Sequence, residues 1–329
     1  MMNKIELLTE LAAKEYKDKF LNKPVFTHSL PKNSEFYDSF WNYQLSAEHN
    51  REWGQQRLIK LKNFIGVNKL HKEASHTLLD MCCGLGRFSI AALELGFENV
   101  VACDGSSVGP KFINDMVVNQ NIPEDSSSTY SKIHTSLPIK NTFSDRIFPV
   151  QLDIEKMNEC FRPKSFGAII HHMALHHTRD YKKTLYDLSQ LLVPNGILVF
   201  NFFTKKTTPQ VTYDLREIFL NEDMKLVRQF LIDNGKREIN SLNNVKNLSD
   251  FDRFLKSKTE SKYLSYRQKL KELTTKYDTK TIYERLTWED MQTPYLHNLD
   301  SNEVIKYVVD DLNLKILNYN YDRICAFKQ

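Results

Sequence analysis

The segment that most constrains the fold is residues 76–104, HTLLDMCCGLGRFSIAALELGFENVVACD. An apolar run is followed by two glycines, Gly84 and Gly86, then by helical spacing and a second apolar run. This order predicts a strand, a glycine loop, a helix and another strand. Three further strand-like runs alternate with helical segments, at residues 146–153, 166–172 and 197–203. Repeated strand–helix units with near-continuously apolar strands predict an α/β fold with a doubly wound, mostly parallel sheet.

Residues 1–70 and 204–287, which lie outside these runs, have helical periodicity. The aromatic cluster that contains Trp41 and Tyr43 is expected either to pack against the next domain or to form a lid over a ligand. The end of the chain predicts a helix with Ser301 as its N-cap, followed by two strands joined by a tight turn. The predicted parts are an N-terminal helical extension (1–74), a sheet-forming core (75–203 and 301–329) and a helical insertion (204–300).

Composition and charge exclude several classes of protein. The 329 residues are 41% hydrophobic and carry 45 Lys+Arg against 41 Asp+Glu, which excludes a disordered chain or a small disulfide-rich protein. Five scattered cysteines without zinc spacing predict a reduced, cytoplasmic protein and no metal. Apolar runs far short of ~20 residues predict no membrane span. Residues 204–287 hold 18 Lys+Arg against 12 Asp+Glu, so the insertion is basic.

The glycine loop and the acidic residues around it predict a cofactor site. Glycines between a strand and a helix let a ligand approach the backbone, close to free N–H groups of the helix. Asp104 follows Gly84 by 20 residues, at the end of the next strand, where a carboxylate can accept hydrogen bonds from ribose hydroxyls. Asp80, four residues before Gly84, is misplaced for a pyrophosphate and suits a cationic ligand with an amino-acid tail. A nicotinamide cofactor is therefore the weaker alternative.

Several motifs together resemble those of class I S-adenosylmethionine-dependent methyltransferases. DMCCGLGRF resembles the first motif of that family, CDGSS the second, VQLDIE the third and LLVPNGILVF the LxPGGxLxx motif. FGAIIHHMALHHTRD resembles the fourth-strand segment of one broad branch, which carries an LHH sequence and a helical cap insertion. The resemblance covers about 75–203 and 301–329, and it implies a Rossmann-like sheet of seven strands. It also implies S-adenosylmethionine as cofactor and S-adenosylhomocysteine as product.

The resemblance also implies a set of cofactor residues. Asp104 would bind the ribose, Asp153 the adenine amino group and Ile154 the adenine ring, while His171 would line the cofactor. The implied set is Asp80, Cys82, Gly84, Gly86, Asp104, Gly105, Ser106, Asp153, Ile154 and His171. The chain departs from the family pattern at four positions, namely Cys82, Gly167, His171 and Asn195.

Four histidines cluster after the fourth strand of the core. If the methyl acceptor is a hydroxyl, His176 or His172 is the candidate general base, because imidazole titrates near neutral pH; a neutral amine needs no base. His172 and His176 are four residues apart and could share a metal, but no carboxylate or cysteine completes a site. For His177 the alternative is a structural role, in which the ring packs in the protein and its nitrogens form hydrogen bonds.

The resemblance and the basic insertion together suggest what is methylated. The expected function is methyl transfer to an O or N atom of a small-molecule or glycan-like acceptor. The alternatives are a tRNA or rRNA methyltransferase, since the insertion is basic, and a non-catalytic S-adenosylmethionine-binding partner subunit. The sequence does not fix the oligomeric state. The candidate substrate-pocket residues are Trp41, Tyr43, Phe203, Arg216, Tyr295 and His297.

Overall fold

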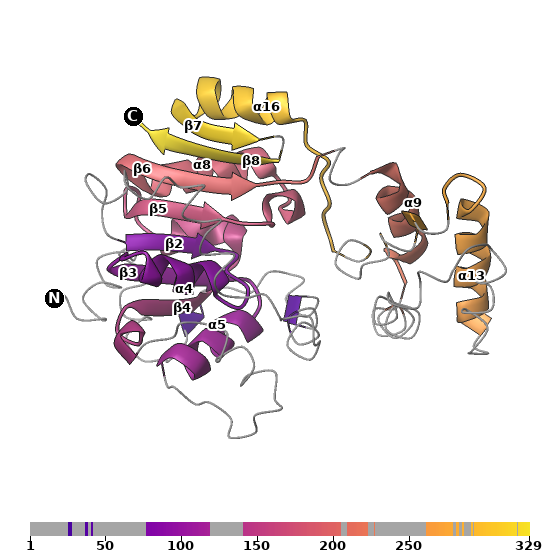
Figure 1. The fold of residues 1–329 in the computed structure, drawn as a ribbon, viewed down its shortest axis with the longest axis horizontal. Helices are drawn as coiled ribbons and strands as arrows, with labels where there is room; N and C mark the ends of the chain where they lie inside the picture. The colour runs from indigo at the N-terminus through magenta and orange to yellow at the C-terminus, as the bar shows by residue number, and fades with distance from the viewer. Residues whose placement is uncertain are drawn as a thin grey trace. The chain divides into compact units, whose positions relative to one another are not determined.

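A computed structural model gives the fold (Figure 1). It describes residues 26–27, 37–38, 41, 77–118, 141–204, 209–222, 227, 261–278, 281–282, 285, 291, 293–320 and 322–329. The chain divides into two compact units. Unit 1 comprises residues 1–203 and 299–329, and unit 2 comprises residues 204–298. The predicted roles of the N-terminal extension and of the insertion stay predictions.

Unit 1 is built on one sheet with the strand order β1-β4-β3-β2-β5-β6-β8-β7. All neighbouring strands are parallel except β8, which runs antiparallel to both β6 and β7. The predicted sheet of seven mostly parallel strands is confirmed, and a two-residue strand, β1, adds an eighth beside β4. The strands are β1 (Phe26–Thr27), β2 (Thr77–Met81), β3 (Asn99–Asp104), β4 (Ile147–Gln151), β5 (Phe166–His171), β6 (Leu192–Asn201), β7 (Leu314–Asn320) and β8 (Arg323–Lys328).

Helices cover both faces of this sheet. The described helices are α4 (Arg87–Glu94), α5 (Val108–Ile113), α7 (Met157–Cys160), α8 (Tyr181–Leu191), α9 (Gln210–Phe219), α13 (Ser261–Leu273) and α16 (Ser301–Lys306). The π-helical turns Asn114–Val118 and Tyr307–Asp311 continue α5 and α16 directly. Short 3-10 turns lie at Asn141–Phe143, Ile154–Lys156 and Leu175–His177. Because α9 and α13 belong to unit 2, the helices on the sheet are those of unit 1.

Alternate residues of each strand enter two separate hydrophobic clusters. Leu79 of β2 packs in the cluster that contains α8 and α16, whereas Leu78 packs in the cluster that contains α4 and α5 (Figure 1). This alternation follows from the two-residue period of a strand. All five residues of β2 and of β4 are buried, as expected for strands covered on both faces. The core therefore has three layers, with the sheet in the middle.

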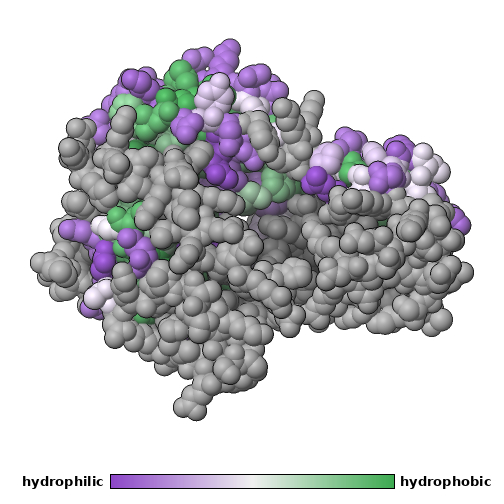
Figure 2. Space-filling model, viewed as in Figure 1, coloured by the Kyte–Doolittle hydropathy of each residue, from purple (hydrophilic) through white to green (hydrophobic). Residues whose placement is uncertain are grey.

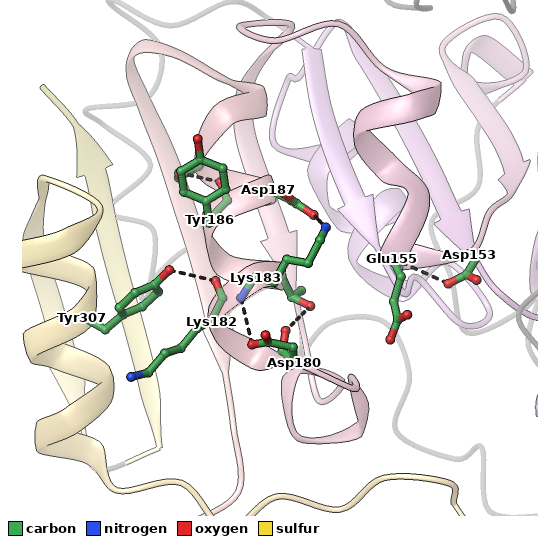
Figure 3. Close-up of polar contacts among 10 residues, drawn as sticks. Asp153, Glu155, Asp180, Lys182, Lys183, Tyr186, Asp187 and Tyr307 are labelled. Atoms are coloured by element: carbon green, nitrogen blue, oxygen red, sulfur yellow. Dashed lines mark hydrogen bonds and ion pairs between the residues drawn. The ribbon is translucent and has the colours of Figure 1, made fainter.

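Two helix starts are fixed by aspartates. Asp180 accepts a hydrogen bond from the Lys183 backbone N–H at 3.0 Å at the start of α8 (Figure 3). Asp300 accepts from Asn302 N and Glu303 N at 2.8 and 3.2 Å at the start of α16. The N-cap predicted at Ser301 is therefore one residue too late. Ser301 is the first helical residue, and the carboxylate before it reaches two otherwise unpaired N–H groups.

Strand β6 begins five residues before the strand-like run predicted at 197–203. The pairing of β5 with β6 jumps from Phe166↔Leu192 to Ala168↔Ile197, so the intervening residues of β6 bulge out of the ladder. Asn195 has φ 62° there. Asparagine tolerates this left-handed conformation better than most residues, which explains how the chain departs from the family's glycine at this position.

The far edge of the sheet is the outer strand β7. Its residues Leu317 and Tyr319 are 43% and 60% exposed. In the view of Figure 2, the described surface around α16 and β7 mixes hydrophobic with hydrophilic residues. A bulge between Ile316 and Asn318 interrupts the pairing of β7 with β8, as edge strands often show.

Unit 2 has its own internal contacts. Phe219 of α9 meets Tyr266 of α13 edge to face at 5.1 Å, and Tyr266 is 1% exposed. The Asp214 carboxylate accepts hydrogen bonds from Lys276 Nζ at 3.2 Å and from Tyr277 Oη at 2.9 Å. The chain leaves unit 1 after Phe203 and re-enters it at Leu299, whose N–H donates to the Phe203 carbonyl at 2.9 Å.

Candidate active site

The site residues predicted from unit 1 gather at one edge of the sheet. Parallel strands have their carboxyl ends on the same edge, and ligands of such sheets bind there. Asp104 ends β3 and His171 ends β5, while Asp153 and Phe203 follow β4 and β6. The glycine loop follows β2 at this edge, next to the point where the strand order reverses.

The glycine loop runs from Cys82 to Gly86 in an unusual backbone conformation. Cys82, Gly84 and Gly86 have φ values of 61°, 53° and 76°. The Cys83 N–H donates to the Cys103 carbonyl at 2.8 Å, which ties the loop to the end of β3. Cys82 occupies a left-handed position that favours glycine, which accounts for the glycine usual in the family. The departure at Cys82 therefore leaves the path of the backbone intact.

Helix α5 packs closely on this loop. A Cβ added to Gly109 would lie 2.1 Å from the Gly84 carbonyl oxygen, so only glycine allows the two backbones to approach. Gly109 could not be singled out from the sequence, because its neighbours GSSVGPKF carry no signal of a contact with residues 25 positions earlier.

The Asp104 carboxylate connects the two loops of the site. Its Oδ2 accepts a hydrogen bond from Gly84 N at 2.8 Å, and its Oδ1 accepts from Ser106 N at 2.9 Å. Burial raises the pKa of Asp104 to about 6; these two N–H groups oppose that shift, and the charge of Asp38 adds to it. A carboxylate has about four acceptor positions, so each oxygen can accept a further hydrogen bond from a ligand hydroxyl.

Asp80 is held within the loop and helix that follow it. It is 1% exposed, and its Oδ2 accepts a hydrogen bond from Ser89 Oγ of α4 at 2.6 Å. Burial raises the pKa of Asp80 to about 7, against the effect of Ser89. This carboxylate therefore fixes the start of α4 relative to β2, and its charge is sensitive to a cation bound nearby.

The predicted adenine-side residues follow β3 and β4. Asp153 is half-buried and accepts a hydrogen bond from Glu155 N at 3.0 Å, which caps the short turn that contains Ile154 (Figure 3). Gly105 is half-buried, and Gln151 donates to its carbonyl at 3.4 Å. Ser106 is completely buried.

The histidines after β5 lie in different surroundings. His171 is completely buried, and its Nδ1 lies 3.2 Å from the Met81 carbonyl oxygen. Burial lowers the pKa of His171 to about 4, so the ring is neutral and its Nδ1 donates the proton of that hydrogen bond. His176 is also fully buried; its ring stacks on Phe203 with centroids 3.6 Å apart and an interplanar angle of 11°. His172 is half-buried, with its ring edge to face with Phe88 at 4.5 Å.

The chain before β2 also reaches this edge of the sheet. Asp38 accepts hydrogen bonds from Ser106 and Ser107, and a Cβ added to Gly84 would lie 2.4 Å from the Trp41 indole ring. Trp41 was predicted from its aromatic neighbours as a pocket residue, and it lies on the glycine loop. Asp38 could not be singled out from the sequence, because a single aspartate in an aromatic segment does not indicate which distant residues it will bind.

Of the other predicted pocket residues, Phe203 follows β6 at this edge, whereas Arg216, Tyr295 and His297 belong to unit 2. Arg216 is 7% exposed in unit 2, where its guanidinium donates to the carbonyls of Thr293 and Pro294. Tyr295 is 38% exposed and His297 half-buried, also in unit 2. Tyr43 lies outside the described residues.

Comparison with known proteins identifies the family. Residues 48–250, more than half of the chain, match the profile of the family described as methyltransferase domain. The chain belongs to this family. The motif resemblance to the class I S-adenosylmethionine-dependent methyltransferases is thus confirmed, whereas its assignment to the LHH branch stays a prediction.

The methyltransferase resembles its known relatives over part of its length. It is 26% identical over 160 residues to an uncharacterized methyltransferase of Schizosaccharomyces pombe, a match that spans 48% of this chain and half of the relative. A solved S-adenosylmethionine-dependent methyltransferase from Mesorhizobium loti is 20% identical, with 42% of this chain and 52% of that chain covered and a TM-score of 0.27. Magnesium protoporphyrin IX methyltransferase from Synechocystis, solved with S-adenosylhomocysteine, is 11% identical over 91% of this chain and all of that chain, with a TM-score of 0.46.

The edge of the sheet fits S-adenosylmethionine, the cofactor that the motif resemblance implies. The Asp104 carboxylate suits the ribose, because each of its oxygens accepts one backbone hydrogen bond and can accept another from a ligand hydroxyl. Asp80 and Asp104 bring two carboxylates to a site for a cationic molecule. Within the described ranges, no three His, Cys, Asp or Glu side chains are grouped so as to hold a metal. No helix among them is long and apolar enough to cross a membrane.

Proposed function

We propose that this methyltransferase binds S-adenosylmethionine at the carboxyl ends of β2, β3 and β4. In this proposal, Asp104 accepts hydrogen bonds from the ribose hydroxyls, Asp153 from the adenine amino group, and Ile154 contacts the adenine ring. The bound cofactor supplies an electrophilic methyl group on a sulfonium. The glycine loop and α4 lie next to the end of β5, so the methyl donor faces the residues that follow β5 and β6.

We further propose an acceptor that presents an O or N atom on a small-molecule or glycan-like body. The observation that carries this proposal is a pair of ring contacts made by residues after β5: His172 meets Phe88 of α4, and His176 stacks on Phe203. Rings of this kind favour an acceptor with a flat or apolar body. Alignment of acceptor and methyl group, with exclusion of water, is what the site contributes to the displacement.

Of the two candidate bases, His172 is the better placed. His176 is fully buried; its ring stacks on Phe203 and meets the His177 ring at an angle of 59°, so its surroundings are those of a packed side chain. His172 is half-buried at the end of β5, where its imidazole can take a proton from an acceptor hydroxyl. An acceptor amine that is already neutral would need no such base.

The alternative of an RNA acceptor has less support. Two described cations of the basic insertion are engaged within unit 2: Arg216 with backbone carbonyls and Lys276 with Asp214. Arg216 is only 7% exposed, so its charge is directed into unit 2 rather than toward a polyanion. In a non-catalytic partner subunit we would expect the place of the methyl acceptor to be filled by side chains. His172, which follows β5 on that side, is only half-buried.

A labelling experiment tests this proposal. The protein is incubated with S-adenosylmethionine carrying a tritiated methyl group and with three fractions of cell extract: molecules below about 3 kDa, total RNA, and protein. Label is expected in the small-molecule fraction with the wild type, and it should be absent with Asp104→Ala, which cannot bind the ribose. Label that is released by ribonuclease would overturn the small-molecule acceptor. Binding of S-adenosylhomocysteine without label in any fraction would favour the partner-subunit alternative instead.

A further inference from the structure

Asp38 makes a dense set of contacts with the loop that follows β3. Its Oδ1 accepts hydrogen bonds from Ser106 Oγ and from Ser107 N, both at 2.7 Å, and its Oδ2 accepts from Ser107 Oγ at 3.1 Å. The partners lie 68 and 69 residues along the chain, so these contacts depend on the tertiary fold. Three hydrogen bonds to one ionised carboxylate are stronger than the same number between neutral groups.

Ser106 joins this carboxylate to that of Asp104. The Ser106 backbone N–H donates to Asp104, while its hydroxyl donates to Asp38 and accepts from Val108 N at 3.0 Å. Ser106 has no exposed surface, whereas Asp38 and Ser107 are half-buried. One residue thus separates the predicted ribose acceptor from a side chain of the N-terminal extension, and a shift of Asp38 would be transmitted to the loop beside Asp104.

Trp41 lies three residues after Asp38 and contacts the glycine loop. A Cβ at Gly84 would come within 2.4 and 2.5 Å of two indole carbons, so the ring is in van der Waals contact with the glycine itself. The Gly84 N–H donates to Asp104 on the same loop. Residues 38 and 41 therefore contact both loops that carry the predicted cofactor residues, Asp38 the loop after β3 and Trp41 the loop after β2.

We propose that Asp38 is a positioning residue: its hydrogen bonds to Ser106 and Ser107 hold Trp41, three residues further along the chain, as a wall of the cofactor site. This inference rests on the proposed binding of the cofactor by Asp104 and the glycine loop. Trp41, which was predicted to line the substrate pocket, is assigned to the cofactor site instead. If these hydrogen bonds keep Trp41 against the cofactor, their loss should speed dissociation of the cofactor, while unit 1 stays folded.

The test compares variants of the full-length protein in their binding of S-adenosylhomocysteine. Asp38→Ala should weaken binding about tenfold or more, mainly through faster dissociation, since it removes charge-assisted hydrogen bonds. Asp38→Asn keeps one acceptor oxygen and should lie between Asp38→Ala and the wild type. Asp115→Ala is the matched control, because Asp115 pairs with Lys111 near the end of α5 and should leave binding unchanged. Ligand-free thermal unfolding, measured in parallel, should show that all four proteins are folded at the temperature of the binding assay.

Fluorescence gives a second readout that a purely structural role would not move. The chain has three tryptophans, and with Trp53 and Trp288 replaced by Phe only Trp41 remains. Its emission should change on addition of S-adenosylhomocysteine, and this change should be smaller with Asp38→Ala. Unchanged affinity of Asp38→Ala would overturn the inference. So would tighter binding, which would mean that the indole ring occupies the place of the cofactor. If the wild type fails to bind, or Asp104→Ala still binds, the proposed function fails first.

Discussion

The contact between Gly84 and Trp41 makes Gly84→Ala a sensitive probe of the structure. Gly84 has φ 53°, and alanine in this left-handed region costs about 1 kcal/mol. The added Cβ would also lie 2.4 Å from the indole ring, an overlap that forces one group to move and typically costs about 2 kcal/mol. We therefore expect Gly84→Ala to lower the free energy of unfolding by about 3 kcal/mol.

Trp41→Ala separates these two contributions. In that background the ring is absent, so Gly84→Ala should retain only the backbone cost of about 1 kcal/mol. The double-mutant cycle should then give a coupling of about 2 kcal/mol between positions 41 and 84. The measurement is urea unfolding of all four proteins without ligand, with the slope of free energy against urea compared among them.

Gly86→Ala is the control for this cycle. Gly86 has φ 76°, and its Cβ would lie 2.7 Å from the Ile113 side chain rather than against Trp41. Its cost should therefore be the same with and without Trp41. The reasoning would be refuted by equal costs of Gly84→Ala in the two backgrounds, because the indole ring could not then rest on the glycine loop.

Three further predictions concern the site and the fold. Binding of S-adenosylhomocysteine should weaken as the pH falls through 6 and approach a tenfold loss per pH unit, because protonated Asp104, whose pKa is about 6, cannot accept two ribose hydroxyls. Titration calorimetry between pH 5 and 8 measures this, and a flat profile would exclude the role of Asp104. Asp300→Ala should lower the free energy of unfolding by about 1 kcal/mol in urea, and Ser301→Ala by much less; the reverse order would place the N-cap at Ser301. His176→Ala should lower the melting temperature because it leaves a cavity against Phe203, whereas His172→Ala should lower methyl transfer with little effect on melting.

The sheet could be predicted from the sequence because its signal is local. The apolar runs that become β2 to β6 stand out from their neighbours, and the final hairpin follows its helix directly. Asp104 was found because a strand end, a glycine loop and a 20-residue spacing define its position. These features depend on the order of residues within about 30 positions.

Features that depend on distant contacts were missed. Asp38 meets Ser106 across 68 residues, and Gly109 needs to be glycine only because Gly84 lies against it. No pattern in the sequence near Asp38 distinguishes it from the other acidic residues of the chain. Ser301 shows the same limit at short range. Serine and aspartate are both good N-caps, and the geometry of the preceding chain decides between Ser301 and Asp300.

The hydrogen bond between Leu299 N and the Phe203 carbonyl has a consequence for engineering. The two points where the chain leaves and re-enters the sheet unit are one hydrogen bond apart, at 2.9 Å. A short linker of a few residues could therefore join Phe203 to Leu299 without pulling on β6 or α16. The segment between them can be treated as an exchangeable cassette, and a different insertion at this junction could be tried without redesign of the strands.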